Sequence, residues 1–282
     1  MSAVSLSLIV AFCTGIAASW DSWVAKRIDP WVGVAWRTVY GLIATMVLSV
    51  AGVEWWNLSG LAWFWLTMAG VLLAGGWLCY MHALQRENSE LSVALSATYT
   101  LPAVFVLIIL GQQVGWLVAS ACLLVVAGGF VAKGSISHGT HGLVWSLAAS
   151  FVWGLWSLAS WQASEQASAI DLTAGSAVVA IVVGLVLVAE VLRQGKSLKI
   201  PLKVAAVKCS CWLVGGFTSW MTFLALDKGP AAQVLVICAA YPLVSLSIGF
   251  IANRQAWNWF KLIAVLLLSS GAAIAALAYA SK

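Results

Sequence analysis

The sequence has 282 residues, of which 63% are hydrophobic and only 8% are charged. Soluble domains carry about 25% charged residues, so this composition excludes a water-soluble fold. The net charge of +5 is spread over short segments between apolar runs, which argues against a nucleic-acid-binding protein. We therefore predict an all-α integral membrane protein with no nucleic-acid partner, whose first segment is mature structure rather than a signal peptide.

Ten apolar runs recur along the chain, and each is long enough to cross a bilayer core, which needs about 20 apolar residues. Short polar joints such as Arg27-Ile28-Asp29-Pro30 separate them, and none is long enough to form a soluble domain. We predict ten transmembrane helices in one membrane domain. In chain order the expected spans are residues 3–25, 31–53, 59–82, 89–110, 114–133, 141–162, 171–192, 205–226, 230–252 and 257–280.

Lysine and arginine are distributed unevenly over the joints. The odd-numbered joints hold eleven of them, including Lys208 in the seventh, whereas the even-numbered joints and the termini hold only Lys228 and Lys282. Arg37 lies inside the second span, toward its first-joint end. Because basic loops are retained in the cytoplasm, we expect both termini outside it. The expected location is a bacterial inner (plasma) membrane.

The two halves of the sequence resemble each other. Gly75-Gly76-Trp77 recurs 140 residues later as Gly215-Gly216-Phe217, and further on Tyr99 pairs with Tyr241 at an offset of 142. An offset of about half the chain means that five helices are repeated. Because five is odd, the second copy starts from the opposite side of the membrane. We therefore predict two inverted five-helix repeats, residues 1–134 and 135–282.

Small motifs follow one another along the first half, and some of them have counterparts in the same order in the second half. They are Ser22-Trp23-Val24-Ala25-Lys26, Arg37, Ala83-Leu84, Pro102 and Gly128-Gly129 in the first half, and Ala225-Leu226, Pro242 and Gly271 in the second. In order and spacing, the sequence resembles the ten-helix EamA-type branch of the drug/metabolite transporter superfamily over nearly its whole length. The resemblance implies alternating access around a central cavity lined mainly by helices one, three, four, six, eight and nine. The acidic residue that the family often carries after helices four and nine is replaced here by Gln112 and Arg254.

Asp21 is an acidic residue inside the first span. Such a side chain costs roughly 2.5–3.5 kcal/mol on insertion scales, so it usually faces a cavity or a partner. Asp21 is therefore predicted to be the counter-charge for a cationic substrate or a carrier of protons. The structural alternative is an ion pair with Lys26 or Arg27 near the membrane interface, or a cap on a broken helix.

Aromatic residues are frequent, with eighteen tryptophans. Those near span ends fit an interfacial belt, but others lie in mid-span. Trp153 and Trp156 are three residues apart and share a helix face, as do Trp77 and Tyr80. With Asp21, the mid-span rings are predicted to form an aromatic box around an ammonium group; the alternatives are stacking on an aromatic substrate, internal packing and contact with lipid. The substrate-binding candidates are Trp20, Asp21, Trp23, Trp77, Tyr80, His82, Tyr99, Trp153, Trp156, Trp220 and Tyr241.

Three residues are candidates for proton coupling, and two are candidates for hinges. Histidine titrates near physiological pH, so His82 joins Asp21 and Glu90 in the first group, with structural roles as the alternative. Pro102 and Pro242 each remove a backbone donor from a span, helices four and nine, and we expect hinges there.

No motif in the sequence indicates catalysis or a cofactor. There is no Ser/His/Asp order, glycine-rich phosphate loop or ATP-binding motif, so we expect no enzyme, no catalytic residues, no metal and no cofactor. The six cysteines lie in apolar runs, where we expect them to pack.

These observations predict a secondary transporter that moves a small organic solute by alternating access. The favoured substrate is an organic cation or zwitterion, such as choline or another quaternary ammonium compound. The alternative is an exporter of amino acids or aromatic metabolites, and a membrane-embedded enzyme is the competing class. The expected partners are the solute and the lipid bilayer; proton coupling and the choice between monomer and homodimer stay open.

Overall fold

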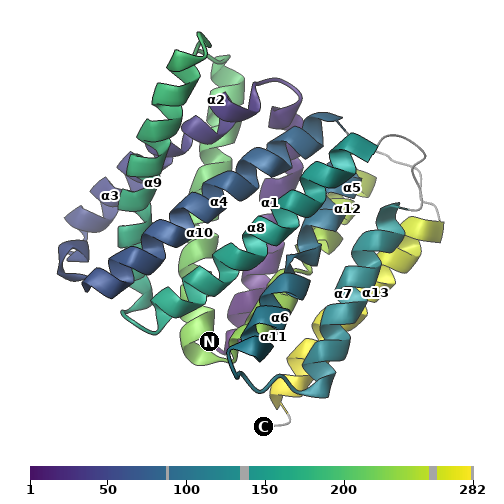
Figure 1. Ribbon diagram of the computed structural model, residues 1–282. Helices are drawn as coiled ribbons and strands as arrows, with labels where there is room; N and C mark the ends of the chain where they lie inside the picture. Colours follow the sequence, from purple (N-terminus) through teal and green to yellow (C-terminus); the bar gives the residue numbers. More distant parts are fainter. Residues whose placement is uncertain (87–88, 134–139, 254–258, 281–282) are drawn as a thin grey trace.

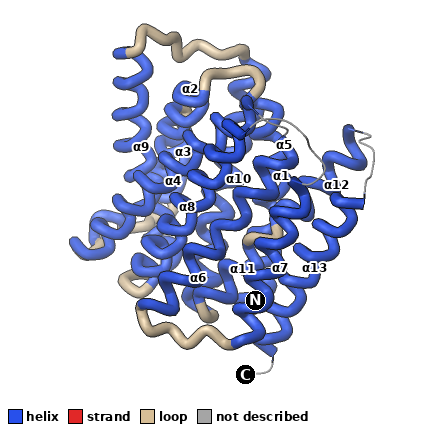
Figure 2. Tube along the Cα trace, turned by 45° about the vertical axis from the view of Figure 1, so that its right-hand side comes forward, coloured by secondary structure: helices blue, strands red, loops and turns tan. Residues whose placement is uncertain are grey.

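The chain folds into a bundle of helices. The computed structural model describes residues 1–86, 89–133, 140–253 and 259–280, and every regular element in these ranges is an α-helix or a short 3-10 helix. The start of α1 and the end of α13 lie at the same end of the bundle (Figure 1). The tube view in Figure 2 shows the joints between helices gathered mainly at the two ends.

The two halves contain matching series of helices. The first half consists of α1 (Ala3–Ala25), α2 (Pro30–Ala35), α3 (Arg37–Val50), the 3-10 helix η1 (Trp55–Asn57), α4 (Gly60–Arg86), α5 (Ser89–Ser96), the 3-10 helix η2 (Ala97–Tyr99), α6 (Thr100–Ile109) and α7 (Trp116–Lys133). The second half consists of α8 (Thr140–Ser164), α9 (Ala169–Arg193), α10 (Leu202–Lys228), α11 (Ala231–Cys238), α12 (Tyr241–Asn253) and α13 (Trp259–Ala280).

These helices make ten spans, five in each half. The second span joins α2 to α3, the fourth joins α5 and η2 to α6, and the ninth joins α11 to α12. Within the described ranges, eight spans are long and apolar enough to cross a membrane, and α7 and α13 contain shorter apolar stretches. Because five is odd, α8 begins at the end of the bundle opposite to the start of α1 (Figure 1). The predicted fold class is confirmed.

Several helices begin where the sequence supplies a cap. The Ser2 hydroxyl accepts a hydrogen bond from the backbone N–H of Ser5 at the start of α1, and Ser168 accepts one from Asp171 at the start of α9. Asp29 caps α2, and Pro30 follows it at the first helical position, where a missing N–H costs nothing. Within a bilayer the remaining backbone groups must pair internally, which is why the apolar runs are helical.

Small residues allow the helices to approach closely. A Cβ on Gly15 of α1 would lie 2.6 Å from the Tyr241 carbonyl oxygen at the start of α12. A Cβ on Gly271 of α13 would lie 2.8 Å from the Ala121 carbonyl oxygen of α7. Packing of this kind drives helix association in lipid, where apolar side chains gain little by leaving the tails. Large apolar side chains accordingly remain on the outside, with Val50 at 90% exposure.

Two spans are interrupted at equivalent places. α5 ends at Ser96 and η2 separates it from α6, while α11 ends at Cys238 and α12 begins at Tyr241. Pro102 and Pro242 each lie in the first turn after the interruption, where proline is tolerated. The hinge role of these two prolines stays a prediction.

Candidate functional site

A cavity of about 150 Å³ lies inside the bundle. Its walls come from α1, α3, α4 and η2 of the first half and from α8, α9, α10, α11 and α12 of the second. The second and seventh spans, represented by α3 and α9, thus join the helices that the family resemblance implied. An apolar cavity of this volume holds a molecule the size of benzene. The cavity is therefore large enough for a small organic solute.

Aromatic side chains dominate the wall. Trp77 lies at the centre of this cluster, with its ring centroid 5.4 Å from that of Trp153 and 5.5 Å from that of Tyr80, both at steep interplanar angles. Such edge-to-face contacts are favoured by the quadrupoles of the rings. The described aromatic residues that line the cavity are Tyr40, Trp77, Tyr80, Tyr99, Trp153, Trp156, Trp212, Phe223 and Tyr241.

Glycines place two of these rings. A Cβ on Gly76 of α4 would lie 2.3 Å from the Trp153 indole nitrogen, and one on Gly216 of α10 would lie 2.4 Å from the Tyr40 hydroxyl oxygen. Only glycine leaves room for these rings. The glycine pairs that mark the sequence repeat therefore shape the cavity from both halves.

The repeat-related tyrosines bridge the two interrupted spans. The Tyr99 hydroxyl donates a hydrogen bond to the Leu235 carbonyl in α11, and the Tyr241 hydroxyl donates one to the Val93 carbonyl in α5. The two donors and the two acceptors are each 142 residues apart, the offset seen in the sequence. Tyr241 also contacts the Ser96 hydroxyl. Each tyrosine thus forms a hydrogen bond between the two repeats beside the cavity.

Other predicted binding residues lie outside the cavity wall. Trp20 is 39% exposed on the outer surface of α1. Trp23 lies under the Arg27 guanidinium, whose carbon is 4.0 Å from the ring centroid. His82 stacks on Trp145 at 4.8 Å, and Trp220 contacts Phe217 edge to face. Their sequence positions indicated mid-span or helix-end placement, which does not specify the direction in which a side chain points.

Asp21 forms an ion pair with Lys208, with 2.5 Å between its Oδ1 and the lysine Nζ. The exposed fractions of the two side chains are 1% and 0%. Asp21 does not line the cavity, and its partner is neither Lys26 nor Arg27, so the structural alternative of a pair with those residues is wrong. The assignment of Lys208 to the seventh joint is also wrong, because it lies within α10. A lysine so near a joint was indistinguishable from a loop residue without its partner.

Arg37 of α3 is the charged residue that lines the cavity. It is 3% exposed, and its Nη1 donates a hydrogen bond to the Gly70 carbonyl in α4. Its Nε is buried without a hydrogen-bond partner, and no ion pair involves Arg37 in the part of the chain that the structure describes. Sequence reasoning noted its position without assigning it a role. The signal was present, because a charge inside a span usually marks a functional site.

Trp212 of α10 was also missed by sequence reasoning. Its ring centroid lies 4.7 Å from the Lys208 Nζ and 5.7 Å from the Arg37 guanidinium carbon. Trp77 faces Lys208 as well, at 5.2 Å. Two rings of the cavity cluster therefore already face cations that belong to the protein.

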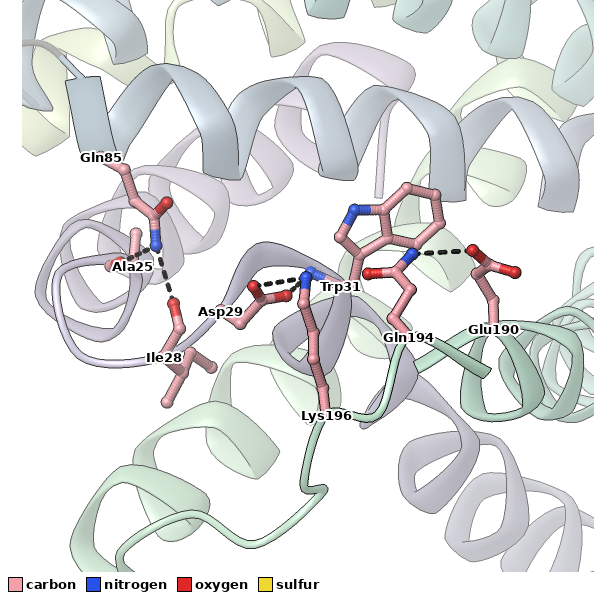
Figure 3. A network of polar contacts seen from close by, with 8 residues as sticks. All are labelled: Ala25, Ile28, Asp29, Trp31, Gln85, Glu190, Gln194 and Lys196. Carbon is pink, nitrogen blue, oxygen red and sulfur yellow. Dashed lines mark hydrogen bonds and ion pairs between the residues drawn. The ribbon is translucent and has the colours of Figure 1, made fainter. Parts of the chain in front are cut away.

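A polar network ties the loops beyond the ion pair (Figure 3). Gln85 at the end of α4 donates to the carbonyls of Ala25 and Ile28, at 2.9 and 2.8 Å. Lys196 in the joint after α9 forms an ion pair with Asp29, with 2.8 Å between Nζ and Oδ2. These contacts join the end of the first span to the third and seventh spans.

The ion pair lies between this network and the cavity. α1 and α10 run antiparallel, as the contacts of Asp21 with Lys208 and of Ala17 with Cys211 show. The cavity-lining residues of α1 precede Asp21, and those of α10 follow Lys208. The network involves residues on the far side of both. Two sets of polar contacts, the ion pair and the loop network, thus lie between the cavity and the end of the bundle opposite to the termini.

The structure also places the cysteines and the side chains that could hold a metal ion. All six cysteines are free thiols. Among the described residues, no group of three His, Cys, Asp or Glu side chains is arranged to hold a metal ion. Glu90 lies in the first turn of α5, but its side chain falls outside the described part of the structure.

Comparison with known proteins assigns the fold to a family. The sequence matches the EamA-like transporter family over residues 1–132 and again over residues 140–277. The chain belongs to the EamA-like transporter family. A solved crystal structure is similar to this EamA-like chain over 97% of both chains, with a TM-score of 0.75 and 17% sequence identity, which supports the fold alone. None of the functionally curated proteins with which it was compared matches it significantly. As an EamA-like protein it is a membrane transporter of the drug/metabolite transporter type.

Proposed function

We propose that this EamA-like protein is a secondary carrier of a small organic solute with an aromatic or apolar body. The observation that carries the proposal is the cavity between the two repeats, walled by Trp77, Tyr80, Trp153, Trp156 and other aromatic rings. Rings of this kind stack on planar or apolar solutes and exclude water from them. The solute is expected to be sealed between the repeats during each cycle.

The polar contacts at one end of the bundle support alternating access. The Asp21–Lys208 pair and the loop network separate the cavity from the end opposite to the termini. The first and seventh joints, whose basic residues include Arg27 and Lys196, lie at that end, which we propose to be cytoplasmic, with both termini outside the cell. Opening to the cytoplasm would then require α1 and α10 to separate. Asp21, His82 and Glu90 remain the proposed sites of any proton coupling.

Between the two substrate classes expected from the sequence, aromatic metabolites fit this cavity better than choline-like cations. Asp21 was predicted to be the counter-charge of a cationic substrate. Its carboxylate is instead paired with Lys208, and Asp21 does not line the cavity. Trp77 already faces Lys208, and Trp23 already faces Arg27. A quaternary ammonium compound would also approach the Arg37 guanidinium, and like charges repel at such distances.

Counterflow in proteoliposomes tests the proposal. Proteoliposomes that contain the purified protein and are loaded with an unlabelled phenyl- or indole-bearing solute should accumulate the labelled form of that solute. Only a carrier exchanges the labelled solute for the unlabelled one. Trp156→Leu should weaken apparent affinity about fivefold through loss of one aromatic contact. Trp220→Leu is the matched control, because Trp220 lies outside the cavity wall. Exchange of choline without exchange of any aromatic solute would overturn the proposed substrate class.

A further inference from the structure

We infer that Arg37 binds a carboxylate group of the transported solute, so that the substrates are small aromatic or apolar monocarboxylates. This inference rests on the proposed carrier function and specifies its substrate class. Arg37 lies in the cavity wall, is nearly fully buried and has no acidic partner among the described residues. A buried cation without a counter-ion is costly in a membrane interior, and a substrate anion would relieve that cost.

The charges around the cavity leave one positive charge uncompensated. Lys208 is neutralised by Asp21, at 2.5 Å between Nζ and Oδ1. Arg37 is the only Asp, Glu, Lys or Arg among the described residues that line the cavity. The site therefore has a charge complementary to a monoanion. It has no lining acidic residue that would balance a cation or the ammonium group of a zwitterion.

The unpaired polar groups of the wall include several donors. The Arg37 Nε, the Trp153 Nε1 and the Trp212 Nε1 are buried N–H groups without a hydrogen-bond partner. The Ser160 and Tyr80 hydroxyls, which can also donate, are likewise unpaired. All five side chains line the cavity. Buried polar groups are nearly always paired in native proteins, so five unpaired ones at one cavity are suited to an acceptor that the solute brings.

A carboxylate supplies the acceptor capacity that these groups lack. Its two oxygens accept about four hydrogen bonds, and the arginine fork matches them in bidentate geometry. The bond from Arg37 Nη1 to the Gly70 carbonyl fixes one arm of the guanidinium and leaves Nε without a partner. We expect the ring or chain of the solute to lie among Trp77, Tyr80 and Trp153 while its carboxylate meets Arg37.

Four probes of nearly the same shape and different charge test this inference. They are phenylacetate, phenylacetamide, phenylalanine and phenethylamine, offered to the full-length protein in binding titrations and in counterflow. Phenylacetate should bind about ten- to hundredfold more tightly than phenylacetamide. This ratio of affinities corresponds to the contribution of one hydrogen bond to a charged group. Phenylalanine should bind more weakly than phenylacetate, and phenethylamine should bind least.

Substitutions at Arg37 assign the preference to this residue. Arg37→Gln should abolish the discrimination between phenylacetate and phenylacetamide, while Arg37→Lys should retain part of it because it keeps the charge. Lys196→Gln is the control, since Lys196 lies in a joint outside the cavity and should leave the discrimination unchanged. The wild-type ranking of the four probes tests the inference even if a variant fails to fold.

Two outcomes distinguish this inference from the proposed function. Exchange of phenylacetamide or phenethylamine with equal or greater efficiency than phenylacetate would overturn the carboxylate site and leave the carrier function standing. Retention of the phenylacetate preference in folded Arg37→Gln would also overturn it. Absence of counterflow with all four probes would overturn the proposed substrate class, and the carboxylate site with it.

Discussion

Lys208 and Arg37 are two buried cations that lie close to the ring of the same residue, Trp212. Lys208 has a carboxylate partner from a helix of the other repeat, whereas Arg37 donates to the Gly70 carbonyl and has no carboxylate partner among the described residues. A membrane interior tolerates a charge when the fold neutralises it or when a cavity and ligand provide for it. Lys208 thus pairs helices of the two repeats, whereas Arg37 is the charge that we propose for the solute.

Removing the partner of Lys208 is expected to have the largest effect. Asp21→Asn leaves a buried, unpaired ammonium group, and we expect a loss of about 3–5 kcal/mol in the free energy of unfolding. Unfolding in detergent, followed by tryptophan fluorescence, measures the change. The double variant Asp21→Asn/Lys208→Met should recover most of the loss. Full stability in the single variant would show that the pair does not hold α1 to α10.

Removing Arg37, in contrast to removing Asp21, is not expected to lower the free energy of unfolding. Arg37→Met eliminates a buried charge without a counter-ion, and we expect the free energy of unfolding to be unchanged or raised by up to about 3 kcal/mol. The same unfolding measurement serves here, and Arg37→Lys, which keeps the charge, is the matched control. A loss comparable to that of Asp21→Asn would place Arg37 among the residues that hold the fold.

Crowding the aromatic cluster tests whether the Trp153 ring contacts the solute. Gly76→Ala would bring a Cβ to 2.3 Å from the Trp153 ring, so the ring must move and we expect about tenfold weaker phenylacetate binding. Gly75→Ala is the matched control, because its Cβ would meet nothing nearer than 3.8 Å. Equal binding by the two variants would exclude Trp153 from solute contact.

The pair at the end of the bundle is expected to matter least. Lys196→Ala removes the contact with Asp29, whose side chain is 34% exposed against 36% for Lys196. Exposed pairs contribute about 0.2–1 kcal/mol, and salt screens them, so the change in unfolding should be small and should shrink at high ionic strength. A loss above about 2 kcal/mol would show that the loop network contributes far more than an exposed pair.

The repeat signal and the cavity differ in how much sequence could reveal. The offset of 142 between Tyr99 and Tyr241 was visible in the sequence, and the hydrogen bonds of these tyrosines share it. The spacing of Trp153 and Trp156 placed them on one face, which is a local property of a helix. The direction of that face, toward the cavity rather than lipid, required the neighbouring helices. Trp220 illustrates this, because it is also in mid-span yet lies outside the cavity wall.

The order of the amino acids was enough to predict the ten spans, their division into five and five, and the family. These follow from apolar length and from a repeat offset, both of which are properties of the chain in order. The packing of the helices was needed to show that Asp21 pairs with Lys208, 187 residues away, and that Arg37 lines the cavity without an acidic partner among the described residues. Neutralisation of a charge depends on which helices pack together, and the apolar pattern of a span does not encode its neighbours.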